Sequence, residues 1–270
     1  MSPAPHDDFR PAAWFADLRR AGQLLTRLPL PGDVGAPPPG SYARAMRAYP
    51  LVGGLIGLAA GLTLSACAAI GLPAPTGPIL ALVVAALLTG GLHEDGLADT
   101  ADGFGARRPT AERLAIMRDS RIGTYGVLAL VFVLSLKVAA MTSLVPVAGC
   151  AALVAAGALS RATLAGIVRA LPPARPGGLG ASLGHPSAAS ALLSLLLGVA
   201  VALAAVGPSA AARIALVAVI AAVAMALLAR RQVGGYTGDV LGATQQVTET
   251  AMLVALSADP VAIAHWIGRS

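Results

Sequence analysis

The feature that most constrains this chain is a series of apolar stretches, most of them close to the length that crosses a lipid bilayer. Hydropathy places them near residues 50–72, 78–92, 124–145, 147–170, 187–206 and 212–229, with a weaker seventh at 240–256. Backbone in hydrocarbon must satisfy its own hydrogen bonds, which favours helices. The sequence therefore predicts an all-α fold, a polytopic membrane helix bundle of about six to seven transmembrane helices.

Composition supports a membrane protein and argues against nucleic-acid binding. Hydrophobic residues make up 56% of the chain and charged residues 12%, with a mean hydropathy of +0.76. The net charge is +6, but the basic residues are scattered at predicted helix ends and form no stripe with aromatic residues. Cys67 and Cys150 lie inside apolar runs, where a small buried side chain is expected and no disulfide is implied.

The N-terminal segment, residues 1–49, is predicted to lie outside the membrane, and residues 50–270 to form a transmembrane catalytic domain. Residues 1–8 are polar and expected to be frayed. Residues 9–30 carry Trp14, Leu18 and arginines at helical spacing, which indicates an interfacial amphipathic helix on an anionic leaflet, with a core helix as the alternative. A proline-rich loop at 31–39 would then bring Arg44 and Arg47 to the membrane edge.

The distribution of arginines orients the bundle. Most arginines outside the spans lie in the N-terminal segment and in alternate loops, which indicates a cytoplasmic N-terminus. The acidic stretch at 90–108 and the glycine-rich loops at 177–185 and 234–239 then share the cytoplasmic side. This arrangement predicts one cytoplasmic-facing active site.

The acidic stretch is the strongest candidate for chemistry. In a helix, Asp95, Asp99 and Asp102 stand at i, i+4 and i+7, within an arc of about 60°. Carboxylates so close repel one another unless a cation lies between them, and oxygen ligands suit Mg²⁺ or Mn²⁺. We therefore expect a divalent-metal site at these three residues. The alternative is that the acids cap a helix and face water.

Glycines and arginines around the acids suggest a phosphate-containing ligand. Gly96, Gly103 and Gly105 would let a phosphate approach the backbone, and Arg107 and Arg108 could clamp it. The preceding apolar run, 78–92, is short for a bilayer. Either its helix continues into the acidic stretch, or the site lies below the membrane surface.

Several other polar residues have both a functional and a structural interpretation. Arg161 and Lys137 lie deep in predicted spans, where each either turns inward to a partner or extends its charged end to the interface. His93 is a base, a supporting partner of the acids, or a structural histidine. Five more polar residues lie near or within predicted spans. Each could bind substrate, or it could simply belong to a solvated helix end or an interior helix surface: Arg118, Asp119, Arg121, Asp239 and Glu249.

Long motifs in matching order identify a family resemblance that covers most of the chain. HEDGLADTADGFGA begins at His93, MRDSRIGTYG at Met117 and GGYTGDVLGATQQVTE at Gly234. TRLPLP, AYPLVGGLIG, LSRA and PARPGGLGASL add to them. Together they resemble the cobalamin synthase family, adenosylcobinamide-GDP ribazoletransferase. Asp99 to Arg107 also matches DxxDGxxAR, the first half of the CDP-alcohol phosphotransferase signature, but Ile116, Ser120 and Thr124 stand where its second half needs glycine and aspartates.

The resemblance implies a reaction and its partners. An alcohol of α-ribazole, or of its 5′-phosphate, would attack the phosphate that joins cobinamide to GMP in adenosylcobinamide-GDP, and GMP would leave. Metal at Asp95, Asp99 and Asp102 would assist, with His93, Glu94 or Asp119 as catalytic groups. The remaining substrate or phosphate ligands would be Arg107, Arg108, Arg118, Arg121, Arg161, Arg175, Gly178, Gly180, Ser182, Asp239 and Glu249.

The same resemblance implies a multi-pass protein of the bacterial cytoplasmic membrane, in contact with lipid and with other cobalamin-assembly enzymes as candidate partners. The sequence specifies no oligomeric state. Two other classes remain open from the residues alone. A CDP-alcohol phosphotransferase would release CMP, and a membrane transporter would use the acids as an ion or proton path.

Overall fold

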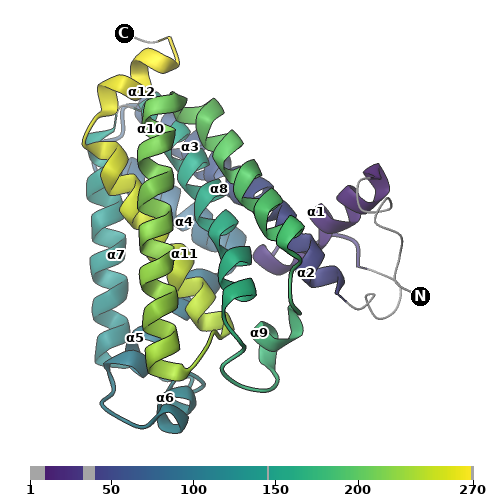
Figure 1. The fold of residues 1–270 in the computed structure, drawn as a ribbon. Helices are drawn as coiled ribbons and strands as arrows, with labels where there is room; N and C mark the ends of the chain where they lie inside the picture. Colours follow the sequence, from purple (N-terminus) through teal and green to yellow (C-terminus); the bar gives the residue numbers. More distant parts are fainter. Residues whose placement is uncertain (1–9, 33–39, 145, 269–270) are drawn as a thin grey trace.

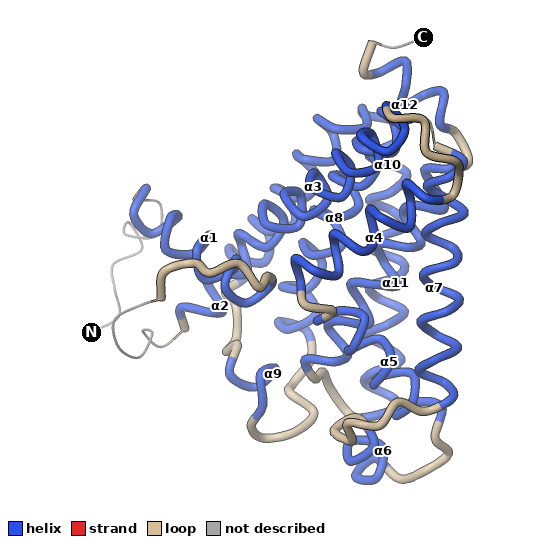
Figure 2. Tube along the Cα trace, turned by 180° about the vertical axis from the view of Figure 1, so that it is seen from behind, coloured by secondary structure: helices blue, strands red, loops and turns tan. Residues whose placement is uncertain are grey.

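The computed structural model describes residues 10–32, 40–144 and 146–268 and is a helical bundle (Figures 1 and 2). Four helical segments are long and apolar enough to cross a membrane: 41–69, 124–143, 148–170 and 188–233. Two bent helix pairs raise this number to as many as six. Within the described ranges there is no strand, so the prediction of a polytopic all-α membrane protein is confirmed.

Helix α8 (Pro146–Ala170) is the central element of the bundle and packs closely against α3 (Tyr49–Ala69). Glycine makes this contact possible, since a Cβ placed on Gly53 would lie 2.1 Å from the carbonyl oxygen of Gly157. Close approach through small residues is the usual way in which helices associate in lipid. By contrast, α7 (Thr124–Ser143) exposes much of its apolar surface at the periphery.

Helix α10 (Ala188–Val233) is two helices joined at a break. Gly207 has φ 79° and ψ 168°, and Pro208 follows it. Figure 1 shows the two limbs of α10 meeting close to α12 (Pro260–Trp266) and separating toward the other end of the bundle. The limbs match the two predicted spans at 187–206 and 212–229, although the second limb starts earlier than predicted because no loop separates them.

The acidic stretch forms its own helix. Helix α4 (Thr76–Thr89) ends at Gly90 and Gly91, which both have a left-handed backbone with φ of 67° and 70°. Helix α5 (Leu92–Gly105) then starts at an angle of 92° to α4. The alternative that one continuous helix runs into the acidic stretch is therefore wrong, because the glycine pair turns the chain.

The N-terminal helix α1 (Pro11–Leu25) packs on the bundle beside α2 (Ser41–Ala45) and the short 3₁₀ helix η2 (Met46–Ala48). It ends before residue 30, the predicted boundary. Asp17 is fully buried and accepts hydrogen bonds from Arg44 and Arg47, and Arg20 is buried 3.8 Å from it. The face of α1 that holds Asp17 and Arg20 contacts protein, and Arg47 of η2 is buried against it. Arg20 and Arg47 are therefore not available to lipid headgroups.

The remaining helices complete one end of the bundle and its interior. Helices α6 (Thr110–Ile116) and α9 (Gly178–Ser182) lie at the same end as α5 (Figure 1). Helix α11 (Gly238–Ser257), predicted as the weaker seventh span, runs through the interior and buries Thr244, Gln245 and Gln246. Residues 1–8 and most of the proline-rich loop lie outside the described residues.

Candidate active site

The acidic face of α5 turns toward the start of α11. Asp99 lies near enough to Asp95 and Asp102, and to Asp239 of α11, to be repelled electrostatically by all three. Gly96 allows this approach, since a Cβ there would lie 2.8 Å from the carbonyl oxygen of Asp239. The prediction that Asp95, Asp99 and Asp102 lie on a helix is thus confirmed. A fourth carboxylate, Asp239 from a distant part of the sequence, lies near them.

Asp102 has a structural partner that the sequence analysis missed. Its carboxylate accepts hydrogen bonds from the backbone N–H groups of Gly123, at 2.7 Å, and Gly126, at 2.9 Å. These groups belong to the first turn of α7, which has unsatisfied N–H donors. Asp102 therefore caps α7 and fixes it to α5, as an acid at a helix N-terminus does. The glycines of the 117–126 motif were a signal for such a close approach.

Two glycine-rich loops from distant parts of the sequence pair beside this face. Ala174 N donates to Tyr236 O at 2.8 Å, and Tyr236 N donates to Pro172 O at 3.0 Å. The hydroxyl of Tyr236 donates to Gly180 O at 3.3 Å. This pairing brings Arg175 to Asp239, with Nη2 3.3 Å from Oδ2. The predicted shared location of the acidic stretch and the two loops is confirmed.

Two cavities meet at Asp95. The larger has a volume of about 680 Å³ and is lined by the turn between α4 and α5, by α5 and α7, and by the segment after α1. The smaller, about 120 Å³, is lined by His93, Arg175 and Asp239 among others. Asp95, Leu24 and Leu92 line both. A group that reacts at Asp95 could therefore be approached from two sides.

The segment after α1 contributes Arg27 to this region, a residue without an assigned role in the sequence analysis. Arg27 N donates to Leu88 O at 2.7 Å, and a Cβ on Gly90 would overlap the Arg27 side chain. Arg27 also lines the larger cavity. Its place in the TRLPLP motif was the signal that could have identified it.

Glu94 is held from α11 and keeps one free oxygen. Gln246 Nε2 donates to Glu94 Oε1 at 2.9 Å, and Lys137 Nζ donates to Gln246 Oε1 at 2.7 Å. Glu94 Oε2 is buried and accepts no hydrogen bond from the described residues. A buried carboxylate oxygen without a donor is costly, so it fits a position that a cation or a substrate hydroxyl would occupy.

Arg161 and Lys137, the two cations inside predicted spans, share one carboxylate. Lys137 Nζ lies 3.3 Å from Glu249 Oε1, and Arg161 Nη1 lies 3.7 Å from Glu249 Oε2. Gln245 also donates to Glu249. Both cations therefore turn inward, and the alternative of snorkelling is wrong. His93 is buried on α5 within electrostatic range of both cations and lines the smaller cavity.

The structure leaves a second group of predicted site residues outside the two cavities. Asp119 pairs with Arg121 in the loop before α7, and this hydrogen-bonded ion pair lowers the pKa of Asp119 to about 2. A carboxylate with so low a pKa is a poor proton acceptor at neutral pH. Arg108 pairs with Glu112 at 3.8 Å on an exposed surface. Also exposed are Arg107, Arg118, Gly178 and Ser182.

The acidic face suits a cation that takes part of its coordination from elsewhere. Among the described residues, no group of three histidine, cysteine, aspartate or glutamate side chains is arranged to hold a metal ion by itself. Mg²⁺ in phosphate-transfer sites usually takes one or two carboxylates and fills its coordination with substrate phosphate and water. The crowded carboxylates around Asp99 and the free oxygen of Glu94 are compatible with this arrangement.

Comparison with known proteins gives a consistent result across nearly the whole chain. A family model described as cobalamin-5-phosphate synthase matches residues 17–257. A protein of Azorhizobium caulinodans named adenosylcobinamide-GDP ribazoletransferase is 45% identical over 251 residues, which cover 89% of this chain and 94% of the relative. One of the same name from Bradyrhizobium diazoefficiens is 43% identical over 256 residues, covering 94% and 96%. No solved structure matches the chain.

Proposed function

The chain belongs to the cobalamin-5-phosphate synthase family, and we propose that it transfers the cobinamide phosphate of adenosylcobinamide-GDP to α-ribazole or to α-ribazole 5′-phosphate. A ribazole hydroxyl oxygen bonds to the phosphorus that joins cobinamide to GMP. The bond from that phosphorus to the GMP oxygen breaks, and GMP leaves. The product is adenosylcobalamin or its 5′-phosphate.

The observation that best supports this proposal is the meeting of Arg175, Asp239 and Asp95 at one wall. These residues come from three motifs far apart in the sequence, and Asp95 also lines the larger cavity. A reaction between a nucleotide-linked corrinoid and a ribazole needs a site with two approaches to one phosphate. Arg175 suits phosphate binding because its planar fork contacts two oxygens at once.

We propose Mg²⁺, with Mn²⁺ as a substitute, as the cofactor of the acidic face. Asp95 and Asp99 would hold it, with substrate phosphate and water filling its coordination, while Asp239 pairs with Arg175 and Asp102 serves mainly to cap α7. A divalent cation at such a face neutralises diphosphate charge and stabilises a leaving oxygen. Asp95 is the carboxylate most open to solvent among these acids and therefore the most accessible to an arriving phosphate.

We propose Glu94 as the group that accepts the proton of the attacking hydroxyl. Gln246 holds its Oε1, which leaves Oε2 as the oxygen available for the proton. Because a proton acceptor must lie within hydrogen-bond reach of its donor, the hydroxyl would enter from the larger cavity, which Glu94 lines. His93, next along α5, lines the smaller cavity and would act by positioning α5 or the phosphate.

We propose that the end of the bundle with α5, α6 and α9 faces the cytoplasm of a bacterial cell and that the protein lies in the cytoplasmic membrane. Arg107, Arg108, Arg230 and Arg231 lie in loops or helix termini at this end, and Arg213 lies near the opposite end of the second α10 limb. Positive residues concentrate on the cytoplasmic side of membrane proteins. Substrates made in the cytoplasm would then reach the site directly.

The test is a reconstituted reaction. Purified protein in lipid is incubated with adenosylcobinamide-GDP, α-ribazole 5′-phosphate and Mg²⁺, and GMP is measured together with the corrinoid product. We expect equal amounts of both, and a loss of both when the ribazole is omitted. An Arg213→Gln variant, altered at the opposite end of the bundle, serves as the control with normal turnover. CMP release from a CDP-alcohol, or solute flux without nucleotide cleavage, would contradict the proposal.

A further inference from the structure

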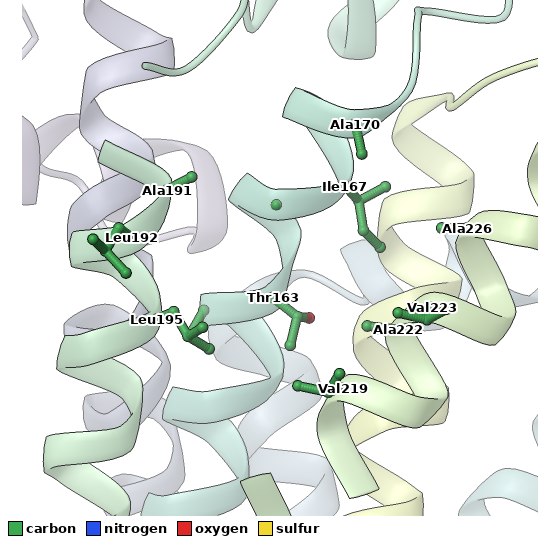
Figure 3. Close-up of a pocket in the computed structure, with 12 residues that line it drawn as sticks. Thr163, Ile167, Ala170, Ala191, Leu192, Leu195, Val219, Ala222, Val223 and Ala226 are labelled. Atoms are coloured by element: carbon green, nitrogen blue, oxygen red, sulfur yellow. The ribbon is translucent and has the colours of Figure 1, made fainter. Parts of the chain in front are cut away.

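A cavity apart from the two at Asp95 lies between the two limbs of α10 and the C-terminal half of α8. Its volume is about 380 Å³, within the range of small-molecule sites, and it shares no lining residue with the two cavities at Asp95. Figure 3 shows α8 residues Thr163, Ile167 and Ala170 between side chains from the two limbs. We call this cavity the α10 groove.

The α10 groove opens on the lipid-facing side of the bundle. Leu192, Val219 and Val223, which line it, are exposed to 57%, 46% and 50%. All three belong to a helical segment apolar enough to cross a membrane. Gly166 widens the groove, since a Cβ placed on it meets no atom within 4 Å. In a bilayer, hydrocarbon must fill this space.

Two arginines follow the lining residues on their helices, about one turn beyond one end of the groove. Arg230 follows Ala226 by one helical turn on the second limb, on the same face as Val219 and Val223. Arg169 follows Gly166 by three residues on α8, and both arginines are exposed. Figure 3 shows Ala170, Ala191 and Ala226 toward one end of the groove and Val219 toward the other. The arginines are therefore expected beyond the end of the groove at which Ala170 and Ala226 lie.

We propose that the α10 groove binds one acyl chain of an anionic phospholipid whose phosphate is held by Arg169 and Arg230. Basic residues at the membrane surface attract anionic headgroups, and basic pockets between transmembrane helices select them. The apolar lining takes the chain, and the arginine pair takes the phosphate. The apolar groove and the two arginines beyond its end would together match the two parts of the lipid.

A second copy of the chain fits the groove less well. A twofold interface would pair the same surface patch of both copies. That patch would carry Arg169 and Arg230 from each copy, and none of the twelve described residues that line the groove is acidic. Charge therefore favours an anionic lipid over self-association.

The proposed lipid would contact a segment that leads to the active site. Arg169 Nη1 donates to Pro186 O at 3.2 Å, and Arg169 O lies 3.1 Å from His185 Nε2. His185 and Pro186 lie near the end of the segment 171–187, which joins α8 to α10 and contains Arg175 and α9. A headgroup at Arg169 therefore lies against the base of the loop that supplies a phosphate ligand.

The test measures lipid retention by the full-length protein. Delipidated protein in a non-ionic detergent is titrated with dioleoyl phosphatidylglycerol or dioleoyl phosphatidylcholine, and bound lipid is counted by native mass spectrometry. We expect one saturable phosphatidylglycerol, bound at least about fivefold more tightly than phosphatidylcholine. Arg169→Gln with Arg230→Gln should remove this preference and keep weak binding of both lipids. Gly166→Leu, which fills the groove, should weaken binding of both.

Two controls match these changes. Arg213→Gln removes one positive charge at the opposite end of the bundle, and Ala139→Leu adds a comparable bulk on exposed α7. Both should bind lipid as the unaltered protein does. Equal affinity for the two lipids in the unaltered protein would overturn the proposal, as would unchanged binding by the double arginine variant. A Gly166→Leu variant that turns a dimer into a monomer without changing lipid retention would assign the groove to self-association instead.

Discussion

Arg161 of α8 lies with its Nη1 3.7 Å from Oε2 of Glu249 of α11, and Lys137 of α7 occupies the other oxygen of that carboxylate. Three helices are joined by one buried glutamate. The sequence left open whether Arg161 turns inward to a partner or extends to the interface, and the family resemblance implied a substrate phosphate as that partner. In the substrate-free protein that partner is a carboxylate.

We predict that Arg161→Lys lowers the melting temperature of the substrate-free protein and leaves the Kd for adenosylcobinamide-GDP nearly unchanged. Lysine keeps the charge but loses the planar fork, and with it the hydrogen bond to Gly157 O. The free energy of unfolding should fall by about 1–3 kcal/mol, the usual range for a disturbed buried network. Thermal unfolding and substrate binding are measured on the same preparation. An unchanged melting temperature with clearly weaker binding would instead make Arg161 a substrate ligand.

We predict different effects for two neighbouring aspartates. Asp99→Asn should lower turnover by at least about a hundredfold and leave thermal stability unchanged, because it removes a carboxylate from the proposed cation site. Asp102→Asn should lower the free energy of unfolding by about 1 kcal/mol, since the single oxygen of an amide cannot replace both carboxylate oxygens that accept from the N-terminus of α7. Turnover at several Mg²⁺ concentrations and thermal unfolding separate the two roles. Normal turnover of Asp99→Asn at limiting Mg²⁺ would remove Asp99 from the cation site.

We predict that Gly96→Ala reduces turnover because its methyl group would lie 2.8 Å from the backbone oxygen of Asp239 and push α5 away from α11. Overpacking of this kind costs about 1–3 kcal/mol. Gly166→Ala is the matched control: the same change in a helix, with no atom within 4 Å. It should be neutral or slightly stabilising. Equal turnover of both variants would show that the spacing between α5 and α11 is not critical.

We predict that Ser120 faces the cytoplasm and Ser209 the outer side. Ser120 lies in the loop before α7, and Ser209 follows the break in α10 at the other end of the bundle. A membrane-impermeant maleimide applied to sealed cells should label a Ser209→Cys variant at once. It should label a Ser120→Cys variant only after the cells are opened. The reverse pattern would invert the proposed orientation.

Much of the fold follows from hydropathy because bilayer thickness and backbone hydrogen bonding leave little choice. The span at 240–256 was weak in sequence because Gln245, Gln246 and Glu249 lower its hydropathy. The structure explains these residues, since they face Ser160, Lys137 and Glu94 inside the bundle. Polar residues in this helix therefore indicate contact with other helices rather than with water.

The candidate site was predicted less completely, because its contacts join residues far apart in sequence. Helical spacing placed Asp95, Asp99 and Asp102 on one face, but the spacing could not distinguish a cation ligand from a helix cap. Asp102 caps α7 through N–H groups more than twenty residues away. The hydrogen-bond partners of Lys137 and the Arg47 partner of Asp17 also come from other helices, and no local pattern identified them.

The charges buried between α5, α7, α8 and α11 have a consequence for how the protein responds to the membrane potential. Lys137 and Arg161 are balanced by Glu249 and by Glu94, so the group is formally neutral. A unit charge moved across 100 mV changes energy by about 2.3 kcal/mol, whereas a neutral group that moves as one body changes it very little. The resting position of this buried group should therefore respond very little to the membrane potential.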